Sequence, residues 1–222
     1  MVDETGKQEH SFAPLIDGTL QGPDTLFAML THYLQALKIE EAAQILFISD
    51  GALWIWERLP ALHKTLKLNG QNVYFLIDFY HAVEHLNKVA SLRKDWSPKI
   101  RKTWLNKQRR TLHEGGVDHV IEAIQKLCRG RNSKTIRTQL NYFIKHHLHM
   151  NYALIAKKRL PSGSGAIEST IRRVVNLRLK GPSLFWCKPN AEAMLLLRAF
   201  CKSGRWSSFK SLTFAPDYAL LA

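Results

Sequence analysis

The sequence lacks the features that mark secreted, membrane-spanning or zinc-finger proteins. Its three cysteines, Cys128, Cys187 and Cys201, are odd in number and show no CxxC spacing, which favours reduced, buried thiols over a disulfide framework or a zinc knuckle. The N-terminus MVDETGKQEH is polar, unlike a signal peptide. No apolar run approaches the roughly 18 residues that a membrane span requires. We therefore expect a soluble, cytoplasmic protein with no membrane contact.

Acidic residues are scarce relative to basic ones. The 222-residue chain has 18 Asp and Glu against 32 Lys and Arg, a formal net charge of +14. Such a surplus raises the affinity for polyanions through counterion release, so nucleic acid is the leading class of partner. The alternative is that the charge only solubilises the surface. Because 45% of the residues are hydrophobic, the chain can bury a real core.

Two short apolar runs, QILFISDG (44–51) and NVYFLIDF (72–79), predict β-strands that are buried on both faces. The segment between them has apolar residues at helical spacing around Pro60, so the three elements should form a right-handed crossover with parallel strands. Residues 22–37 predict an amphipathic helix that begins near Pro23. The stretch SFAPLIDGT (11–19) is a candidate for a further strand.

From about residue 80 the pattern is helical throughout. Segments at helical period are separated by DWSP, EGG and RGRN, and two more follow Glu168. We expect an α/β protein with a large helical content, in which a helical block interrupts the α/β part. The final residues, SSFKSLTFAPDYALLA, have no clear period and are expected to be loosely held.

Both predicted strands end in an aspartate, Asp50 and Asp78. Parallel neighbouring strands bring their carboxyl ends to one edge of a sheet, where open α/β folds bind ligands. A carboxylate that follows an apolar run needs a cationic partner, and Mg²⁺ prefers oxygen ligands. The alternative for each residue is that it caps the following helix.

Glu168 is the candidate third carboxylate. It follows the turn PSGSGA and precedes a basic run without further acid, formed by Arg172, Arg173, Arg178 and Lys180. Carboxylates that hold metal ions beside cations that hold phosphates suit phosphoryl transfer on DNA. The alternative is an acid favoured by a helix N-terminus next to a solvated basic face.

The segment DFYHAVEH contains a second metal-like pattern. His81, Glu84 and His85 form H-x-x-E-H, which resembles an inverted zinc-peptidase motif. A catalytic zinc also needs a third protein ligand, and peptide hydrolysis has no use for the basic charge. We therefore favour a role for His81 in binding phosphate or orienting an acid, and a packed environment for His85.

Five tryptophans could stack on unpaired bases, although such residues at helical spacing more often belong to a core. Trp186, in the loop FWC (185–187) after the basic run, is the one that we expect to contact DNA.

Taken together, LFISDGALWIW, YFLIDFYHAVEHL and LPSGSGAIESTIRRVVNLRLKGPSLFWC resemble bacterial insertion-sequence transposases of the DDE type, in the Kra group related to Mutator-like elements. The resemblance runs from about residue 12 to 206. It implies a ribonuclease H-like fold with an all-helical insertion before the last acid. It also implies that Asp50 and Glu168 are the second and third carboxylates, which hold Mg²⁺ or Mn²⁺, and that Asp78 with His81 forms an accessory D-x-x-H element.

The sequence departs from that family at its N-terminus. In such folds the first catalytic Asp lies on the first strand, but only 49 residues precede Asp50. MVDETGK resembles the end of the second strand, so the first strand and its Asp are expected to be missing. The expected parts are a partial ribonuclease H-like core (1–87), a helical insertion (88–160), core helices with the last acid (161–206) and a tail (207–222).

The sequence therefore predicts the C-terminal portion of a transposase, which cleaves and transfers DNA strands at element ends and target sites. One alternative is a catalytically inactive DNA-binding remnant. Two others are a self-sufficient nuclease that uses Asp50, Asp78 and Glu168, and a zinc peptidase. Assembly into a homo-oligomer is left open.

Overall fold

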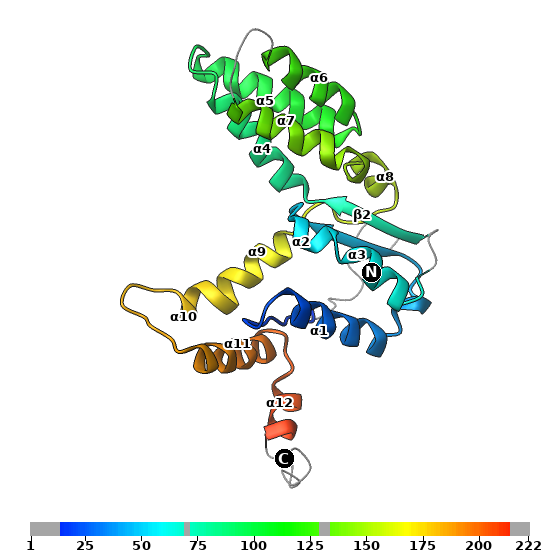
Figure 1. The fold of residues 1–222 in the computed structure, drawn as a ribbon, viewed down its shortest axis with the longest axis vertical. Helices are drawn as coiled ribbons and strands as arrows, with labels where there is room; N and C mark the ends of the chain where they lie inside the picture. The colour runs from blue at the N-terminus through cyan, green and yellow to red at the C-terminus, as the bar shows by residue number, and fades with distance from the viewer. Residues whose placement is uncertain (1–13, 69–71, 129–133, 214–222) are drawn as a thin grey trace. The chain divides into compact units, whose positions relative to one another are not determined.

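The computed structural model describes residues 14–68, 72–128 and 134–213. The chain divides into two compact units, which we name the central unit (Leu30–Ser164) and the terminal unit (Met1–Met29 with Gly165–Ala222). The described residues are mostly helical and include one small parallel sheet, so the protein is α/β with a high helical content (Figure 1). None of the helices within these ranges is both long and apolar enough to cross a membrane.

The sheet of the central unit pairs β1 (Ile45–Ser49) with β2 (Val73–Ile77) in parallel, from Ile45 opposite Val73 to Ser49 opposite Ile77. Both strands and their parallel pairing were predicted from the apolar runs. A short turn, η1 (Ile39–Glu41), precedes β1, and α2 (Leu53–Trp56) and α3 (Leu59–Thr65) connect the strands. Pro60 lies in the first turn of α3, where its missing N–H has no intrahelical partner to lose.

Two expectations about strands are wrong. Every residue of β1 is only partly buried, and in β2 only Leu76 and Ile77 are buried. No third strand pairs with either one in the described part of the chain. The described residues 14–19 form no strand. Thr19 instead bonds to helix α11 (Lys188–Lys202), since its Oγ1 donates to Glu192 at 2.6 Å. Residues 1–7, expected to end another strand, lie outside the described residues.

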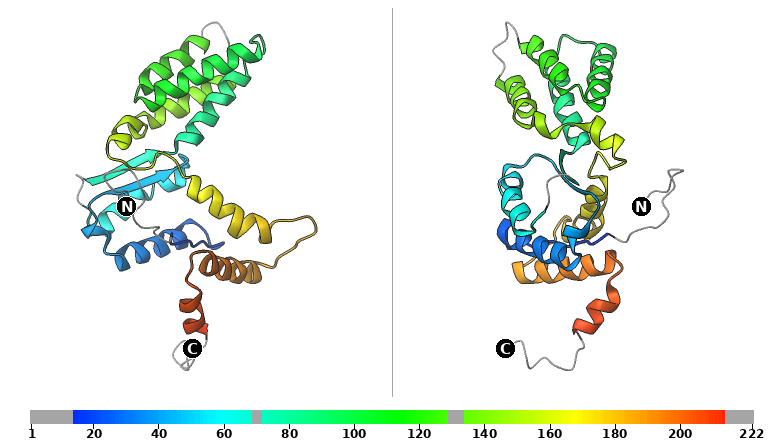
Figure 2. Two further views of the ribbon diagram at one scale, coloured as in Figure 1. Left: turned by 180° about the vertical axis from the view of Figure 1, so that it is seen from behind. Right: turned by 90° about the vertical axis from the view of Figure 1, so that its right-hand side faces the viewer.

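The described remainder of the central unit is helical, as its periodicity predicted. It comprises α4 (Phe79–Ser91), α5 (Pro98–His113), α6 (Val117–Cys128), α7 (Lys134–His146), the 3₁₀ turn η3 (His147–His149) and α8 (Tyr152–Lys157). Helices α4 to α7 pack side by side (Figures 1 and 2). Their apolar faces and the end of β2 bury one continuous core, in which Leu86, Val120, Ile124 and Phe143 are completely buried.

The terminal unit is built around a much smaller core. Its described helical segments are α9 (Gly165–Ile171), a π-helix (Arg172–Asn176), α10 (Leu177–Leu179), α11 (Lys188–Lys202) and α12 (Trp206–Thr213), and α1 (Pro23–Ala36) includes residues of both units. Ile16, Val174, Leu195 and Ala199 form the core. The expectation of buried thiols is wrong for Cys187 and Cys201, which are exposed. Helix α12 occupies residues for which the sequence predicted only a loosely held tail, and residues 214–222 lie outside the described part.

Candidate functional site

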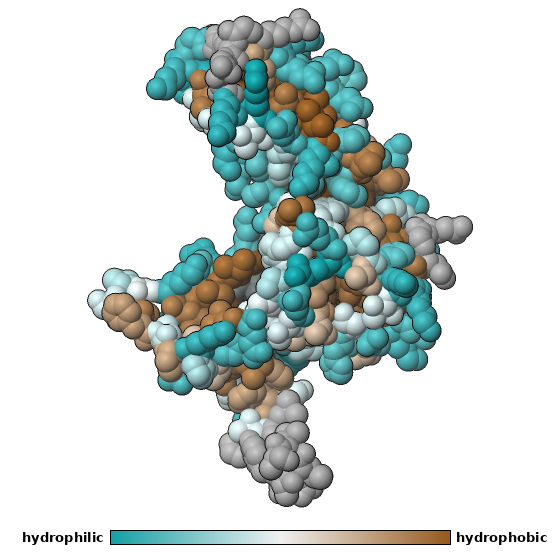
Figure 3. Space-filling model, in the orientation of Figure 1, coloured by the Kyte–Doolittle hydropathy of each residue, from teal (hydrophilic) through white to brown (hydrophobic). Residues whose placement is uncertain are grey.

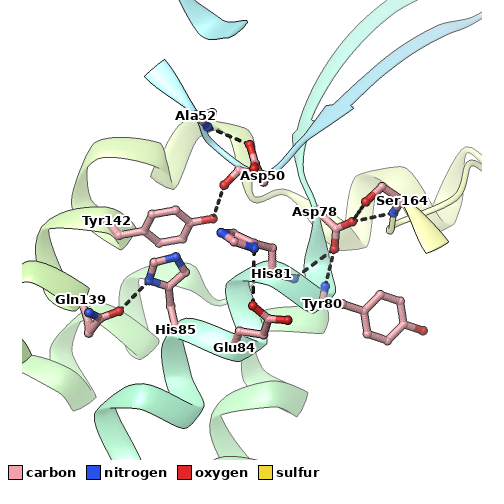
Figure 4. A network of polar contacts seen from close by, with 10 residues as sticks. All are labelled: Asp50, Ala52, Asp78, Tyr80, His81, Glu84, His85, Gln139, Tyr142 and Ser164. Atoms are coloured by element: carbon pink, nitrogen blue, oxygen red, sulfur yellow. Dashed lines mark hydrogen bonds and ion pairs between the residues drawn. The ribbon is translucent and has the colours of Figure 1, made fainter. Parts of the chain in front are cut away.

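Asp50 and Asp78 lie at the same edge of the sheet, as the parallel strands predicted. Each follows the last residue of its strand, and Asp78 N donates to Ser49 O at 2.8 Å, which extends the ladder by one residue. Figure 4 shows this edge with the side chains that surround it. The two aspartates differ sharply in environment, because Asp50 is exposed whereas Asp78 is only 4% exposed.

The Asp78 carboxylate is fully occupied by hydrogen bonds. Its Oδ1 accepts from Tyr80 N at 2.7 Å and His81 N at 3.1 Å, which caps α4. Its Oδ2 accepts from the backbone N–H (2.6 Å) and the hydroxyl of Ser164. Burial alone would raise the pKa of Asp78, but the bonds from Ser164, His81 and Tyr80 outweigh burial and hold the pKa below its ordinary value. Asp78 is therefore an ionised structural anchor with no oxygen left for a metal ion.

The same contacts fix the turn PSGSGA, which we name the glycine–serine loop, against the start of α4. Phe79 N donates to Ser162 O at 2.9 Å, beside the bonds between Asp78 and Ser164. A Cβ on Gly163 would come within 2.6 Å of Tyr80 Cδ2, so a larger residue at this point would require the Tyr80 ring to shift. The loop is thus held at the carboxyl end of β2, and α9 begins at the next residue, Gly165.

Asp50 keeps one carboxylate oxygen available. Its Oδ1 accepts from Ala52 N at 2.9 Å, and its backbone oxygen accepts from the Tyr142 hydroxyl at 3.2 Å. Gly51 follows with φ of +89°, and a Cβ there would lie 3.1 Å from Tyr142 Cε2 and 3.3 Å from His146 Nε2. A tight glycine turn therefore presents the Asp50 carboxylate at the surface.

The H-x-x-E-H residues form an aromatic and polar cluster beside Asp50 (Figure 4). His81 Nδ1 lies 3.6 Å from Glu84 Oε2. His85 Nδ1 lies 2.6 Å from Gln139 Oε1, and its ring stacks on Tyr142 with centroids 3.7 Å apart. Burial lowers the pKa of His85, although the bond to Gln139 opposes this shift. His85 is packed, as predicted.

Tyr142 is a site residue that the sequence did not reveal. It comes from α7, 92 positions from Asp50, and no motif surrounds it. Burial raises its pKa, and the negative charges of Asp50 and Asp78 add to the shift. The phenol therefore stays protonated and serves as the donor that fixes the turn after β1.

The two strand-end aspartates differ in their fit to a divalent cation. Asp50, with an exposed oxygen, suits Mg²⁺, whereas Asp78 is saturated and does not. Across residues 14–68, 72–128 and 134–213, no three His, Cys, Asp or Glu side chains are placed to hold a metal ion together. The zinc alternative therefore has two possible ligands, His81 and His85, with Glu84 between them. The described residues place no third protein ligand beside these two, and a catalytic zinc requires one.

The other predicted site residues belong to the terminal unit. Glu168 is exposed in the first turn of α9, and Arg172 and Arg173 open the π-helix that follows. Such wide turns leave backbone carbonyls without their usual partners. Arg198 of α11 binds two of them, donating to Val174 O at 2.7 Å and to Arg173 O. The proximity of Glu168 to Asp50 stays a prediction.

The loop after the basic run carries its apolar side chains on the surface. Phe185 is 94% exposed, and Leu184 and Trp186 are 50% and 37% exposed. Figure 3 shows further hydrophobic residues gathered over α9 and the turns that follow it. Arg178 and Lys180 precede the loop, so cations and exposed aromatic rings adjoin along the chain.

Trp56 illustrates the opposite environment. It stacks on His149 with ring centroids 4.4 Å apart and packs against the main core. This tryptophan therefore has the structural role that helical spacing favoured.

Comparison with protein-family models, with curated proteins and with solved structures returned no match to this chain.

Proposed function

We propose that this chain is the catalytic portion of a transposase with a ribonuclease H-like core, which cleaves and transfers DNA strands. One observation carries the proposal. An exposed carboxylate, Asp50, ends a parallel strand next to Asp78, and Asp78 binds the loop that leads into Glu168. The motifs quoted above for the family coincide with these segments.

Chain connectivity supports a partnership between Asp50 and Glu168. Glu168 follows the anchored Ser164 by four residues, and four residues span at most about 14 Å. Asp50 and Asp78 end neighbouring strands, which are about 4.8 Å apart in parallel sheets. Chain connectivity therefore permits Glu168 to reach the edge that presents Asp50.

In the proposed reaction each group has a separate task. Asp50 and Glu168 hold the cation, and Asp78 keeps the loop in place. Arg172, Arg173, Arg178 and Lys180 bind phosphates, and Trp186 contacts bases. Mg²⁺, when bound, supplies the charge that activates the attacking oxygen and stabilises the leaving oxygen. Water would attack a phosphodiester in line, break its P–O3′ bond and leave a 3′-hydroxyl and a 5′-phosphate. That 3′-hydroxyl would then attack a target phosphodiester in line, and the new P–O bond would replace the bond to the target's own 3′-oxygen, which leaves as a 3′-hydroxyl.

Two rival functions are less well supported. A nuclease that uses Asp50, Asp78 and Glu168 as its triad would need a free oxygen on Asp78, and four hydrogen bonds occupy that carboxylate. The zinc peptidase would need a third ligand beside His81 and His85, and the described residues supply none in place.

A nicking and strand-transfer assay on the full chain tests the proposal. If Asp50 and Glu168 suffice without the first Asp that the family resemblance implies, Mg²⁺- or Mn²⁺-dependent cleavage should fall at least about 100-fold in Asp50→Asn and in Glu168→Gln, because each removes a metal-binding charge. Glu122→Gln, an exposed acid on α6, is the matched control and should cleave normally. Unchanged cleavage in Asp50→Asn would refute the proposed site, and DNA binding without any cleavage would identify an inactive remnant.

A further inference from the structure

Helix α5 carries a row of basic and polar side chains on one face. The helix contains six Lys and Arg residues and no Asp or Glu. Residues spaced by three, four or seven positions share a helix face. The exposed residues at that spacing, which we name the α5 stripe, are Lys99, Lys102, Asn106, Arg109, Arg110 and His113.

The charges of the α5 stripe are largely uncompensated. Arg110 Nε lies 2.8 Å from Glu114 Oε1, just past the end of the helix. Lys99, Lys102 and Arg109 have no ion pair in the described part of the chain. A merely solvated helix usually intersperses acids, as α6 does with Asp118, Glu122 and Lys126. Clustered cations repel one another, and a bound polyanion would relieve that repulsion.

The α5 stripe ends in a pocket of about 380 Å³. It is lined by Phe79, Asn106, Arg109, Arg110, His113 and Glu114. Two of these groups pack against the ring of Phe79, which is 4% exposed. The Arg109 guanidinium carbon lies 5.9 Å from its ring centroid, and the His113 ring packs edge-on at 5.5 Å. The Glu114 carboxylate also lines the pocket and pairs with Arg110, so the donors left for a phosphate group are Asn106, Arg109 and His113, beside the aromatic ring.

The pocket lies next to the edge of the sheet described above. Phe79 directly follows Asp78, and its backbone N–H is bonded to Ser162 O at 2.9 Å. From Lys99 to His113 the stripe spans about 21 Å of helix. That length matches the rise of about six nucleotides of one DNA strand.

We propose that the α5 stripe binds the phosphate backbone of duplex DNA and that its terminal pocket holds one phosphate close to the Asp50–Asp78 edge. This interaction is independent of base sequence, because every contact is to phosphate. The proposal rests on the proposed function only in taking DNA as the ligand. It does not require the chain to cleave DNA.

Binding of a labelled DNA duplex, followed by fluorescence anisotropy at several NaCl concentrations, tests the stripe. We expect Lys102→Gln/Arg109→Gln to weaken binding about tenfold or more and to reduce the slope of log K against log[salt] by about 1.8, since each lost phosphate contact removes about 0.9. The matched control, Lys126→Gln/Lys145→Gln, removes the same charge from α6 and α7. It should change the slope by less than about 0.5.

The outcomes separate the stripe from the catalytic proposal. If the stripe variant binds like the control while the wild-type chain still cleaves DNA, the stripe is refuted and the proposed function stands. If the stripe variant alone loses binding but the wild type never cleaves, the stripe stands and the catalytic function fails. A wild-type chain that binds no DNA, or that binds double-stranded RNA of the same sequence more tightly, refutes the DNA stripe. Circular-dichroism melts of all variants verify that these exposed substitutions leave the fold intact.

Discussion

The central and terminal units are stabilised in different ways. The central unit buries a continuous core formed by helices α4 to α8 and the end of β2. The described part of the terminal unit has a core cluster of four buried residues. It also relies on hydrogen bonds between residues far apart in the sequence, such as Arg205 Nη2 to Ile16 O at 2.7 Å. One unit therefore supplies a rigid base for Asp50, and the other holds Glu168 and the basic run with far less apolar burial.

The largest expected effect is the loss of a core leucine from the central unit. Leu86 is completely buried in α4, so Leu86→Ala should lower the free energy of unfolding by about 3 kcal/mol. Leu195→Ala, in the small core of the terminal unit, should cost about 2 kcal/mol or less, because few neighbours surround the cavity. Urea unfolding followed by circular dichroism measures both. Equal losses would contradict the contrast between the units.

The next largest effect is the difference in stability lost when each strand-end aspartate is replaced by alanine. Asp78→Ala leaves several part-buried donors without an acceptor and should cost about 2–3 kcal/mol. Asp50→Ala loses one exposed bond and should cost less than about 1 kcal/mol. The same urea titration distinguishes them, and a larger loss in Asp50→Ala would show that Asp78 is not the anchor.

The anchor also predicts a dependence on pH. Because the pKa of Asp78 is held below its ordinary value of 3.8, the stabilisation is present above pH 3.8. It is lost as the pH falls through the lowered pKa.

A smaller pH dependence of stability should arise from His146 in the central unit. His146 is 5% exposed, and its burial, with smaller effects from Lys145 and two histidines, lowers its pKa from 6.5 to about 4. Between these values the unfolded chain binds more protons, so stability should be complete above pH 6.5 and fall as the pH drops towards 4.

Replacing His146 by leucine tests whether this residue causes the pH dependence. His146→Leu should reduce the dependence between pH 6.5 and 4, measured as thermal melts across that range. The part that remains belongs to His85 and His149, whose pKa values burial also lowers. The described part of the terminal unit contains no histidine and adds no histidine titration to this interval. An unchanged dependence in His146→Leu would assign it to other groups.

The sequence predicted the elements better than their surroundings. The two apolar runs were sufficient to place β1, β2 and the aspartates at one edge, because parallel pairing requires no knowledge of side-chain contacts. The helical periods of α4 to α7 were equally clear. The full burial expected for β1 was wrong, since burial depends on what covers a strand and not on its own residues.

The contacts of the candidate site could not be predicted in the same way. Capping of α4 by Asp78 was one of two alternatives, and only the fold shows that Ser164 completes the set of donors. Tyr142 lies 92 positions from Asp50 and carries no motif. Its role arises from the packing of α7 beside the sheet, which no local pattern encodes.

The most direct measurement concerns whether Asp50 and Glu168 hold the same cation. Fe²⁺ can replace Mg²⁺, and with ascorbate and peroxide it generates hydroxyl radicals that cut the backbone near the bound ion. We predict cuts near residues 50 and 168 in the full chain, both suppressed by excess Mg²⁺ and both lost in Asp50→Asn. Cuts at only one of the two positions, or cuts near 168 that persist in Asp50→Asn, would contradict a shared site.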